Sequence, residues 1–307
     1  MVCYSPLKGY YSSEKNRTGK RSIVFNSKGG LVDRPVSLPC QKCIGCRLER
    51  SRQMAARCTH EAQMHPENCF LTLTYSPQYL PLDQSIDIQE TQKFLKRLRK
   101  KTGTIRFFAC GEYGDQLGRP HYHLIIFGYD FPDKIFYKSV NDNRLYTSAL
   151  LTKIWGKGFC TIGDVTFESA AYVARYCTKK ITGLKALSHY KKLIDGVYYT
   201  VRPEFGHQSL KPGLGTSWLK KYYRDVYPSD EIVIRGSVMQ PPRYYDQLME
   251  TISPSLLKQT LKGRSKNYRY HPDNRSRRLR QREIVKLAQI TNLKRNIENE
   301  TPNDDNL

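Results

Sequence analysis

The sequence lacks any apolar run long enough to cross a membrane, and it is poor in acidic residues. Its longest aliphatic stretches, such as 124–127 (LIIF), fall far short of the roughly 20 residues that a membrane-spanning helix needs. No charged segment followed by an apolar one precedes Cys3, so we expect neither export nor a membrane partner. Only 28 of its 307 residues are Asp or Glu, against 51 Lys and Arg, which gives a formal net charge of +23.

This excess of positive charge indicates a polyanionic partner. The chain also contains 22 Tyr and 11 Phe. Lys and Arg neutralise phosphate groups and aromatic rings stack on unpaired bases, so the composition favours nucleic acid as the partner. A basic surface that is merely well solvated is the alternative. Composition alone does not distinguish a protein that binds nucleic acid from one that cuts it.

Length and patterning divide the chain into three segments. Hydrophobic residues make up 39% and charged residues 26%, which is typical of a globular protein with a buried core, and the length suggests about two domains. Residues 1–65 are Cys-rich and end in a helix that begins at Ile44 and stops before Pro66. Residues 66–185 have the most regular pattern and carry only +6 of the net charge. Residues 186–307 are basic, with a mostly helical pattern, and we assign them to DNA binding or to an accessory role.

The middle segment predicts an α+β fold. We expect strands at 70–75, 105–112, 121–127 and 158–165, and helices at 87–101, 147–155 and 167–181. Asp87 and Glu90 form a capping pair for the first of these helices. The order β-α-β-β-α-β with a trailing helix is that of a ferredoxin-like split βαβ, an antiparallel sheet with helices packed on one face.

Two histidines, His121 and His123, stand at the start of one expected strand. Because side chains alternate along a strand, both imidazoles point to the same face and can share a metal ion. The preceding strand ends at Glu112, and a short loop would fold this carboxylate back beside the two rings. Such a set suits Mg²⁺ or Mn²⁺ acting on phosphate, and zinc also fits it. The alternatives are two satisfied polar histidines and an exposed turn carboxylate.

The expected helix 167–181 carries regularly spaced tyrosines. An apolar stripe that would pack onto the sheet consists of Ala170, Val173, Ala174, Cys177 and Ile181. Tyr172, Tyr176 and Lys180 are spaced four apart and would line a neighbouring face outside that stripe. The two phenols are therefore either surface residues or nucleophiles that a metal and nearby cations assist.

Cys40, Cys43 and Cys46 open the first helix at a spacing that commonly holds zinc. Cys3 is the best remaining partner for a closed tetrahedral site, whereas Cys58 falls on the apolar stripe of its helix. An iron–sulfur centre and free thiols in a reducing cell are the alternatives. With nine cysteines, an odd count, a disulfide framework is disfavoured.

Three motifs stand in a fixed order along the chain: FLTLT at 70–74, Glu112 before His121-Tyr122-His123, and Tyr172-x-x-x-Tyr176. Together they resemble the motifs of HUH endonucleases that initiate rolling-circle replication. The wording RPHYHLIIFG, AAYVARYCTKK and CQKCIGC is similar to initiators of microviruses, the small single-stranded DNA bacteriophages, and especially to those of the gokushovirus group. The resemblance covers roughly residues 40–185 and identifies 66–185 as an HUH endonuclease core.

The resemblance implies a nicking and joining mechanism on single-stranded origin DNA. A metal held by His121, His123 and Glu112 would polarise the scissile phosphate, and one tyrosine would attack to give a 5′-phosphotyrosine link and a free 3′-OH. The second tyrosine would release and reseal a unit-length circle, although Tyr176 with Lys180 also fits a single-tyrosine pattern, Y-x-x-x-K. No G-x-x-x-x-G-K-[ST] motif occurs, so a host polymerase and a host helicase are the implied partners, in the host bacterial cytoplasm.

Several basic residues are assigned to DNA contacts. They are Lys96, Arg97, Lys100, Arg119, Lys179, Arg277, Arg278 and Arg280. Most of the net charge, +17 of +23, lies outside 66–185, where we expect it to grip DNA away from the chemistry.

Two other functions share part of this pattern. An HUH relaxase or transposase would use the same chemistry, and a non-catalytic binder would hold single-stranded DNA or RNA on an aromatic-rich sheet. The paired tyrosines, the length and the Cys-rich start favour a replication initiator, and the converging metal ligands argue against a binder.

Overall fold

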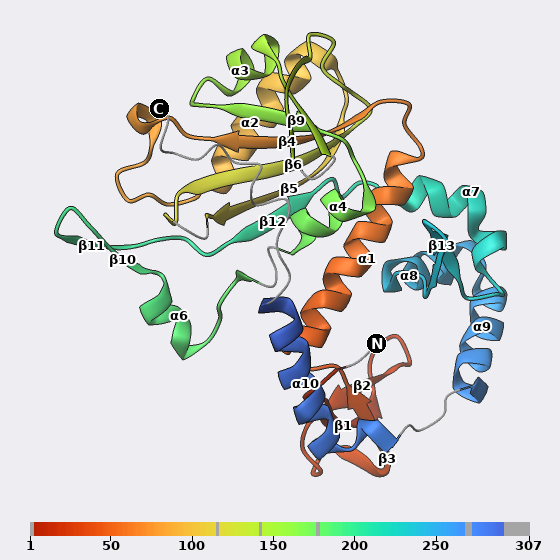
Figure 1. Cartoon of the computed structure of the whole chain (residues 1–307). Helices are drawn as coiled ribbons and strands as arrows, with labels where there is room; N and C mark the ends of the chain where they lie inside the picture. Colours follow the sequence, from red (N-terminus) through yellow and green to blue (C-terminus); the bar gives the residue numbers. More distant parts are fainter. Residues whose placement is uncertain (1–2, 115–116, 141–142, 176–178, 268–271, 292–307) are drawn as a thin grey trace. The chain divides into compact units, whose positions relative to one another are not determined.

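The computed structural model describes residues 3–114, 117–140, 143–175, 179–267 and 272–291 (Figure 1). The chain divides into two compact units, one of Met1–Glu49 with Arg269–Lys294 and one of Arg50–Tyr268 with Arg295–Leu307. Helix α1 (Ile44–Ala62) begins in the first and ends in the second. This division rests on contacts within the chain, whereas 1–65, 66–185 and 186–307 are delimited by charge and patterning and stay a prediction.

An antiparallel sheet organises the larger unit. Within the described residues it has seven strands, in the order β12-β5-β6-β4-β9-β8-β7. Their bounds are β4 (Asn68–Thr74), β5 (Arg106–Tyr113), β6 (Pro120–Phe127), β7 (Ile135–Val140), β8 (Asn143–Thr147), β9 (Cys160–Gly163) and β12 (Phe205–Gln208). Because β6 lies between β4 and β5, the unit formed by β4, the intervening helix and β5 is split by a third strand. The expected α+β class with a large antiparallel sheet is confirmed.

Helices cover both faces of this sheet. Side chains alternate along β4, so Leu71 and Leu73 face α2 (Ile88–Thr102) and α3 (Ala149–Trp155), while Phe70 faces the other way, toward α1 and α4 (Phe167–Ala174). The expectation of helices on one face is therefore wrong. All eight residues of β6 are buried, and a strand that is apolar in both parities requires cover on both sides.

Local signals place most of these helix ends. The Asp87 side chain accepts a hydrogen bond from the Gln89 backbone N–H and begins α2, as expected, but Glu90 pairs with Lys93 and Lys157 instead of closing the cap. The Ser148 side chain caps α3, and Gly156 ends it with a positive φ of 69°. The predicted strand 158–165 is shorter than expected, and β7, β8 and β12 were absent from the prediction.

The rest of the larger unit mixes helices with hairpins. After the 3₁₀ turn η1 (Pro77–Tyr79) and the core come α6 (Leu184–His189), the hairpin of β10 (Lys191–Ile194) and β11 (Val197–Thr200), and α7 (Thr216–Val226). The hairpin of β13 (Ile232–Ile234) and β14 (Ser237–Met239) precedes α8 (Arg243–Ile252) and α9 (Pro254–Asn267). Leu219, Tyr245 and Met249 are fully buried in a core that these elements share with Ala56 of α1.

The smaller unit contains little more than a sheet and a helix. Strands β1 (Leu7–Lys15), β2 (Arg21–Val24) and β3 (Gly30–Leu38) form an antiparallel sheet in the order β2-β1-β3. The 3₁₀ turn η2 (Pro272–Asn274) and α10 (Ser276–Thr291) complete it. The expected Cys-rich N-terminus is present.

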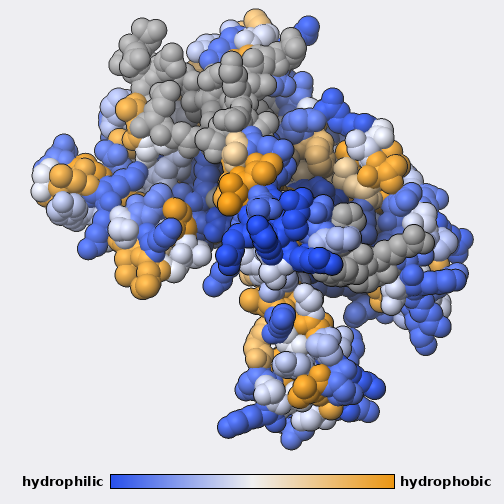
Figure 2. Space-filling view, turned by 60° about the horizontal axis from the view of Figure 1, so that its bottom comes forward, coloured by the Kyte–Doolittle hydropathy of each residue, from blue (hydrophilic) through white to orange (hydrophobic). Residues whose placement is uncertain are grey.

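The surface is dominated by hydrophilic residues. Figure 2 shows one face on which hydrophobic residues gather only in small separate groups. No helix in the described part of the chain combines the length and the apolar character that a membrane span requires.

Gly158 offers a test of how closely the chain packs beside β4. A Cβ at this position would lie 2.4 Å from the Thr74 carbonyl oxygen and 2.5 Å from the Ser76 backbone nitrogen, so backbone would have to move. We expect Gly158→Ala to cost about 2 kcal/mol or more, measured by denaturant unfolding. The control is Gly163→Ala on β9, whose Cβ would make ordinary contacts of 3.5 and 3.8 Å. Equal stability of the two variants would contradict this packing.

Candidate metal and nucleophile site

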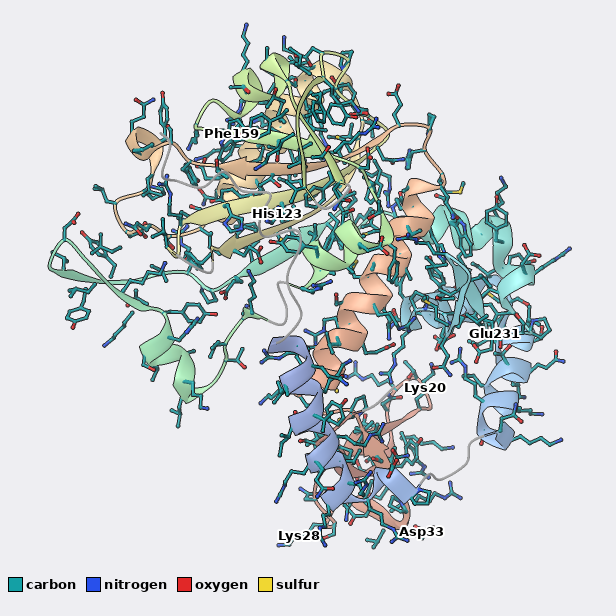
Figure 3. The ribbon with its side chains drawn as sticks, in the orientation of Figure 1. Lys20, Lys28, Asp33, His123, Phe159 and Glu231 are labelled. Carbon is teal, nitrogen blue, oxygen red and sulfur yellow. The ribbon has the colours of Figure 1, made fainter. Side chains whose placement is uncertain are left out.

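The pairing of β5 with β6 brings Glu112 and the two histidines together. Glu112 pairs with His121 and Cys110 with His123, so the carboxylate and both imidazoles emerge on the same face of the sheet. Their potential ligand atoms all lie within 4.8 Å of one another, and all three residues are buried. Glu112 is only 2% exposed, which removes the alternative of an exposed turn carboxylate. His123 lies on the strand between β4 and β5 (Figure 3).

The two imidazole rings present their Nε2 atoms to one carboxylate oxygen. His121 Nε2 lies 3.3 Å and His123 Nε2 lies 3.4 Å from Glu112 Oε1. His121 Nδ1 lies 3.2 Å from the Arg119 carbonyl oxygen, which can only accept, so Nδ1 carries the proton and the neutral ring has its lone pair on Nε2. His123 Nδ1 lies 3.1 Å from Thr72 Oγ1. These outer contacts orient both rings as metal ligands are oriented in proteins.

The charge states at the site suit a divalent cation. Burial favours the protonated form of Glu112, but the adjacent His121 and His123 rings and the charge of Lys179 hold the pKa of Glu112 well below its usual range. Lys179 Nζ lies 3.4 Å from Glu112 Oε2. Burial lowers the pKa of His123 to about 4. At neutral pH the carboxylate is therefore anionic and His123 is neutral, the forms that bind metal.

One buried atom tests whether a metal fits. His123 Nε2 is buried and has no hydrogen-bond partner among the described residues. Leaving a buried nitrogen unpaired costs free energy, on the order of 1–3 kcal/mol, and a metal ion would satisfy its lone pair. Two imidazole nitrogens and a carboxylate oxygen form a mixed donor set that suits a catalytic divalent ion with open positions. The residues present therefore fit such an ion.

Tyr172 reaches the same site from α4. Its hydroxyl donates to Glu112 Oε1 at 3.1 Å, and its ring meets His123 edge-on with 5.0 Å between centroids. The expectation that Tyr172 lies outside the packed face is wrong, because the residue is only 7% exposed and belongs to the core between α4 and the sheet.

The helix that carries Tyr172 is shorter than predicted. It ends at Ala174 with Arg175 as its C-cap, and Ile181 is not helical, so the apolar stripe does not continue to that residue. Tyr176 and Cys177 lie outside the described residues. Lys180 is half-buried and is not among the groups that contact Glu112 in the described part of the chain.

The basic residues assigned to DNA have different surroundings. Lys96 and Lys100 are exposed on α2, which packs on the sheet face opposite the histidines. Arg97 donates to the carbonyl oxygens of Ile154 and Trp155 at 2.7 and 3.2 Å, so it holds the end of α3. Arg119 donates to the Tyr75 carbonyl oxygen at 2.9 Å.

On α10, Arg277, Arg278 and Arg280 are exposed, and Arg278 pairs with Asp273 at 3.0 Å. Lys179 contacts Glu112 and thereby belongs to the His–His–Glu site. Contact of all these residues with DNA stays a prediction.

Two contributions to the site were missed. Thr72, which contacts His123, lies in the FLTLT motif, and strand alternation places it on the same face as Phe70, so parity alone could have indicated it. The ion pair of Lys179 with Glu112 had no local signal, because the two residues are brought together only by the packing of the segment after α4.

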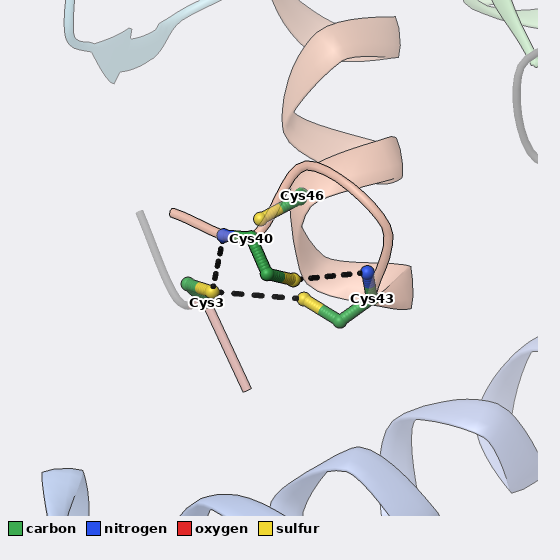
Figure 4. A group of neighbouring side chains, drawn as sticks. All are labelled: Cys3, Cys40, Cys43 and Cys46. Atoms are coloured by element: carbon green, nitrogen blue, oxygen red, sulfur yellow. Dashed lines mark hydrogen bonds between the residues drawn. The ribbon is translucent and has the colours of Figure 1, made fainter. Parts of the chain in front are cut away.

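A second group of potential ligands lies in the smaller unit. The sulfur atoms of Cys3, Cys40, Cys43 and Cys46 all lie within 4.8 Å of one another (Figure 4). Cys58 is fully buried on α1 and outside this group, as expected.

The fold and the His–His–Glu site define an α+β protein with a buried donor set beside a tyrosine. The family described as Replication-associated protein ORF2 matches residues 68–181, the stretch that contains Glu112, both histidines and Tyr172. Replication-associated protein VP4 of Bdellovibrio phage phiMH2K is 34% identical over 259 residues, which cover 80% of this chain and 76% of the relative. The chain therefore belongs to the family of phage replication-associated proteins.

Other relatives agree. Replication-associated protein ORF2 of Spiroplasma virus 4 is 34% identical over 231 residues, 70% of this chain and 68% of the relative. Replication-associated protein ORF4 of Chlamydia phage 1 is 32% identical over 227 residues, 70% of this chain and 54% of the relative. No solved structure shows a significant match to the chain.

Thr72 provides a test of metal binding that leaves all three ligands in place. Thr72→Val removes the group that orients His123 while keeping the volume similar, and we expect Mn²⁺ affinity to fall about 10- to 100-fold in calorimetric titrations of the full chain. The control is Thr161→Val, a buried position opposite Thr72 on β9. If Thr72→Val binds Mn²⁺ as tightly as the control does, Thr72 does not support a metal ligand.

Proposed function

We propose that this protein initiates rolling-circle replication of a phage genome by nicking and rejoining single-stranded origin DNA. The observation that carries the proposal is the Glu112 carboxylate, whose Oε1 is approached by both imidazole Nε2 atoms and by the Tyr172 hydroxyl. A metal-ligand set and a nucleophile within hydrogen-bond reach of one carboxylate is the arrangement that metal-assisted transesterification requires.

Each residue has a role in this reaction. His121, His123 and Glu112 would hold Mg²⁺ or Mn²⁺, which when bound polarises the scissile phosphate and stabilises its developing charge. Lys179 adds a positive charge beside Glu112. The hydrogen bond from Tyr172 to Glu112 holds the phenol oxygen at the edge of the ligand set. Because the pKa of Glu112 is held low, this carboxylate is a weak base and orients the hydroxyl rather than keeping its proton.

The bonds balance without an energy source. The tyrosine oxygen attacks the phosphorus and loses its proton, the P–O3′ bond breaks, and the departing 3′ oxygen is protonated. The products are a 5′-phosphotyrosine and a free 3′-OH that a host polymerase can extend after a host helicase has unwound the duplex. In the joining step the 3′-OH of the completed strand attacks the phosphotyrosine and restores the tyrosine hydroxyl. With two tyrosines, Tyr172 and Tyr176 exchange these roles from one round to the next.

The relatives support replication over plasmid transfer or transposition, because all three are named as replication-associated proteins of phages or viruses. The reaction would therefore take place in the host bacterial cytoplasm. The converging ligands are unnecessary for a protein that only binds single strands, which argues against that function.

The test is a covalent adduct between the full chain and labelled single-stranded origin DNA in Mn²⁺, followed on a denaturing gel. We expect wild type to form the adduct, chelation to abolish it, and His123→Ala to reduce it below detection. The double change Tyr172→Phe with Tyr176→Phe should remove it, because no phenol then remains beside the ligand set. The control is Tyr198→Phe, a phenol that is 75% exposed and outside the site.

Two results would contradict this mechanism. Adduct formation by the double tyrosine variant would place the nucleophile elsewhere, and cleavage by His123→Ala at the wild-type rate would remove the metal from the reaction. If Tyr172→Phe alone nicks as wild type does but fails to rejoin circles, Tyr172 performs the second step.

A further inference from the structure

The four clustered cysteines come from two separate stretches of the chain. Cys3 precedes β1, whereas Cys40, Cys43 and Cys46 lie in the loop and first turn that open α1 (Figure 4). Residues nearly 40 positions apart are thus held at one point. Within this group Cys43 is 8% and Cys46 is 3% exposed, and Cys3 and Cys40 are half-buried.

The distance between two sulfurs indicates what joins them. Cys3 Sγ lies 3.9 Å from Cys43 Sγ, far beyond the roughly 2.05 Å of a disulfide. Four sulfurs arranged tetrahedrally around zinc, with Zn–S bonds of about 2.3 Å, are about 3.8 Å apart along each edge. The observed spacing is therefore that of metal ligands.

Backbone amides surround the sulfurs in the manner of bound thiolates. The Cys40 N–H donates to Cys3 Sγ at 3.2 Å, the Cys43 N–H to Cys40 Sγ at 3.2 Å, and the Tyr4 N–H to Cys43 Sγ at 3.3 Å. A thiol sulfur is a weak acceptor, whereas a thiolate bound to metal is a strong one. Gln41 between the first two loop cysteines has a φ of +63°, an uncommon conformation for a residue with a side chain, and this tight turn brings their sulfurs together.

The smaller unit lacks the apolar core that would stabilise it otherwise. Among its described residues, the buried hydrophobic side chains are those of Cys43, Cys46 and Leu279. Strand β1 is exposed at most positions, as is β3. The unit also carries 17 Lys and Arg against 5 Asp and Glu, so its charges repel one another. Small folds with so little burial depend on a metal or on disulfides.

We propose that Cys3, Cys40, Cys43 and Cys46 bind one structural Zn²⁺, and that this ion holds the basic N-terminal unit in its folded form. Four protein ligands close the coordination sphere, so the site has no open position for substrate. The ion ties the residues before β1 to the start of α1, and its four thiolates compensate its charge within a strongly positive unit. This site is independent of the proposed nicking reaction, which uses the His–His–Glu set.

The first experiment measures metal in the full chain, purified without added metal. We expect one zinc per chain by mass spectrometry, released stoichiometrically when a mercurial reagent titrates the thiols. Cys43→Ser should lose the zinc, whereas Cys58→Ala, a buried cysteine of α1 outside the group, should keep it. His123→Ala should also keep it, which separates this ion from the one at the His–His–Glu site.

The second experiment uses wild type alone and so does not depend on the folding of a variant. After replacement of zinc by Co²⁺, we expect the absorption spectrum of tetrahedral thiolate cobalt. Removal of zinc should raise amide hydrogen exchange in β1–β3 and α10 and leave β4–β6 protected, because the larger unit has its own core.

Three results would overturn the proposal. They are iron with visible charge-transfer absorption in the purified chain, a disulfide among the four cysteines in mass spectra, and zinc retained by Cys43→Ser. Unchanged hydrogen exchange in β1–β3 after zinc removal would show that the ion does not hold the unit together. None of these outcomes bears on adduct formation, so failure here and failure of the nicking mechanism are distinguishable.

Discussion

The register between β5 and β6 is the constraint on which the His–His–Glu site depends. A slip by one residue would carry His121 and His123 to the opposite face and separate them from Glu112. Tyr122, between the two histidines, opposes such a slip, because its fully buried ring lies in the core on the α2 side. There its hydroxyl accepts a hydrogen bond from the Asp87 backbone N–H at 2.9 Å and lies 3.1 Å from the hydroxyl of Tyr75. The residue that is not a ligand thus fixes the two that are.

Cover on both faces of the sheet gives this site its electrostatic character. With α1 and α4 packed over the histidines, Glu112 is removed from water, and interactions among charged groups there are stronger than they would be at the surface. A buried carboxylate without partners would become protonated, but Lys179 and the two rings keep it ionised. The same packing brings the Tyr172 hydroxyl to the carboxylate. Burial, ionisation and placement of the nucleophile therefore follow from one structural feature.

Local sequence patterns predicted the elements and the ligand set, but not what covers them. Alternation placed His121 and His123 on one face, and a short connection was enough to add Glu112. The burial of Tyr172 and the contact of Thr72 with His123 join residues 60 and 51 positions apart, and no local pattern encodes such distances. Strand β12 pairs with β5 from almost 100 residues away, and β7 escaped prediction because its apolar residues Ile135 and Phe136 are exposed. What failed was tertiary, and what succeeded was local.

Two donor sets of different chemistry imply that this chain sorts its metals. Divalent zinc binds most nitrogen and oxygen sites more tightly than Mn²⁺ does, so affinity alone would not keep zinc out of the His–His–Glu set. Four thiolates bind zinc far better than two imidazoles and a carboxylate can. One equivalent of zinc per chain would therefore be taken up by the cysteines, leaving the catalytic ligands to the more abundant Mg²⁺ or Mn²⁺. The basic unit with its 17 Lys and Arg, in a chain of 51, would then owe its folded form to one metal and the chemistry to another.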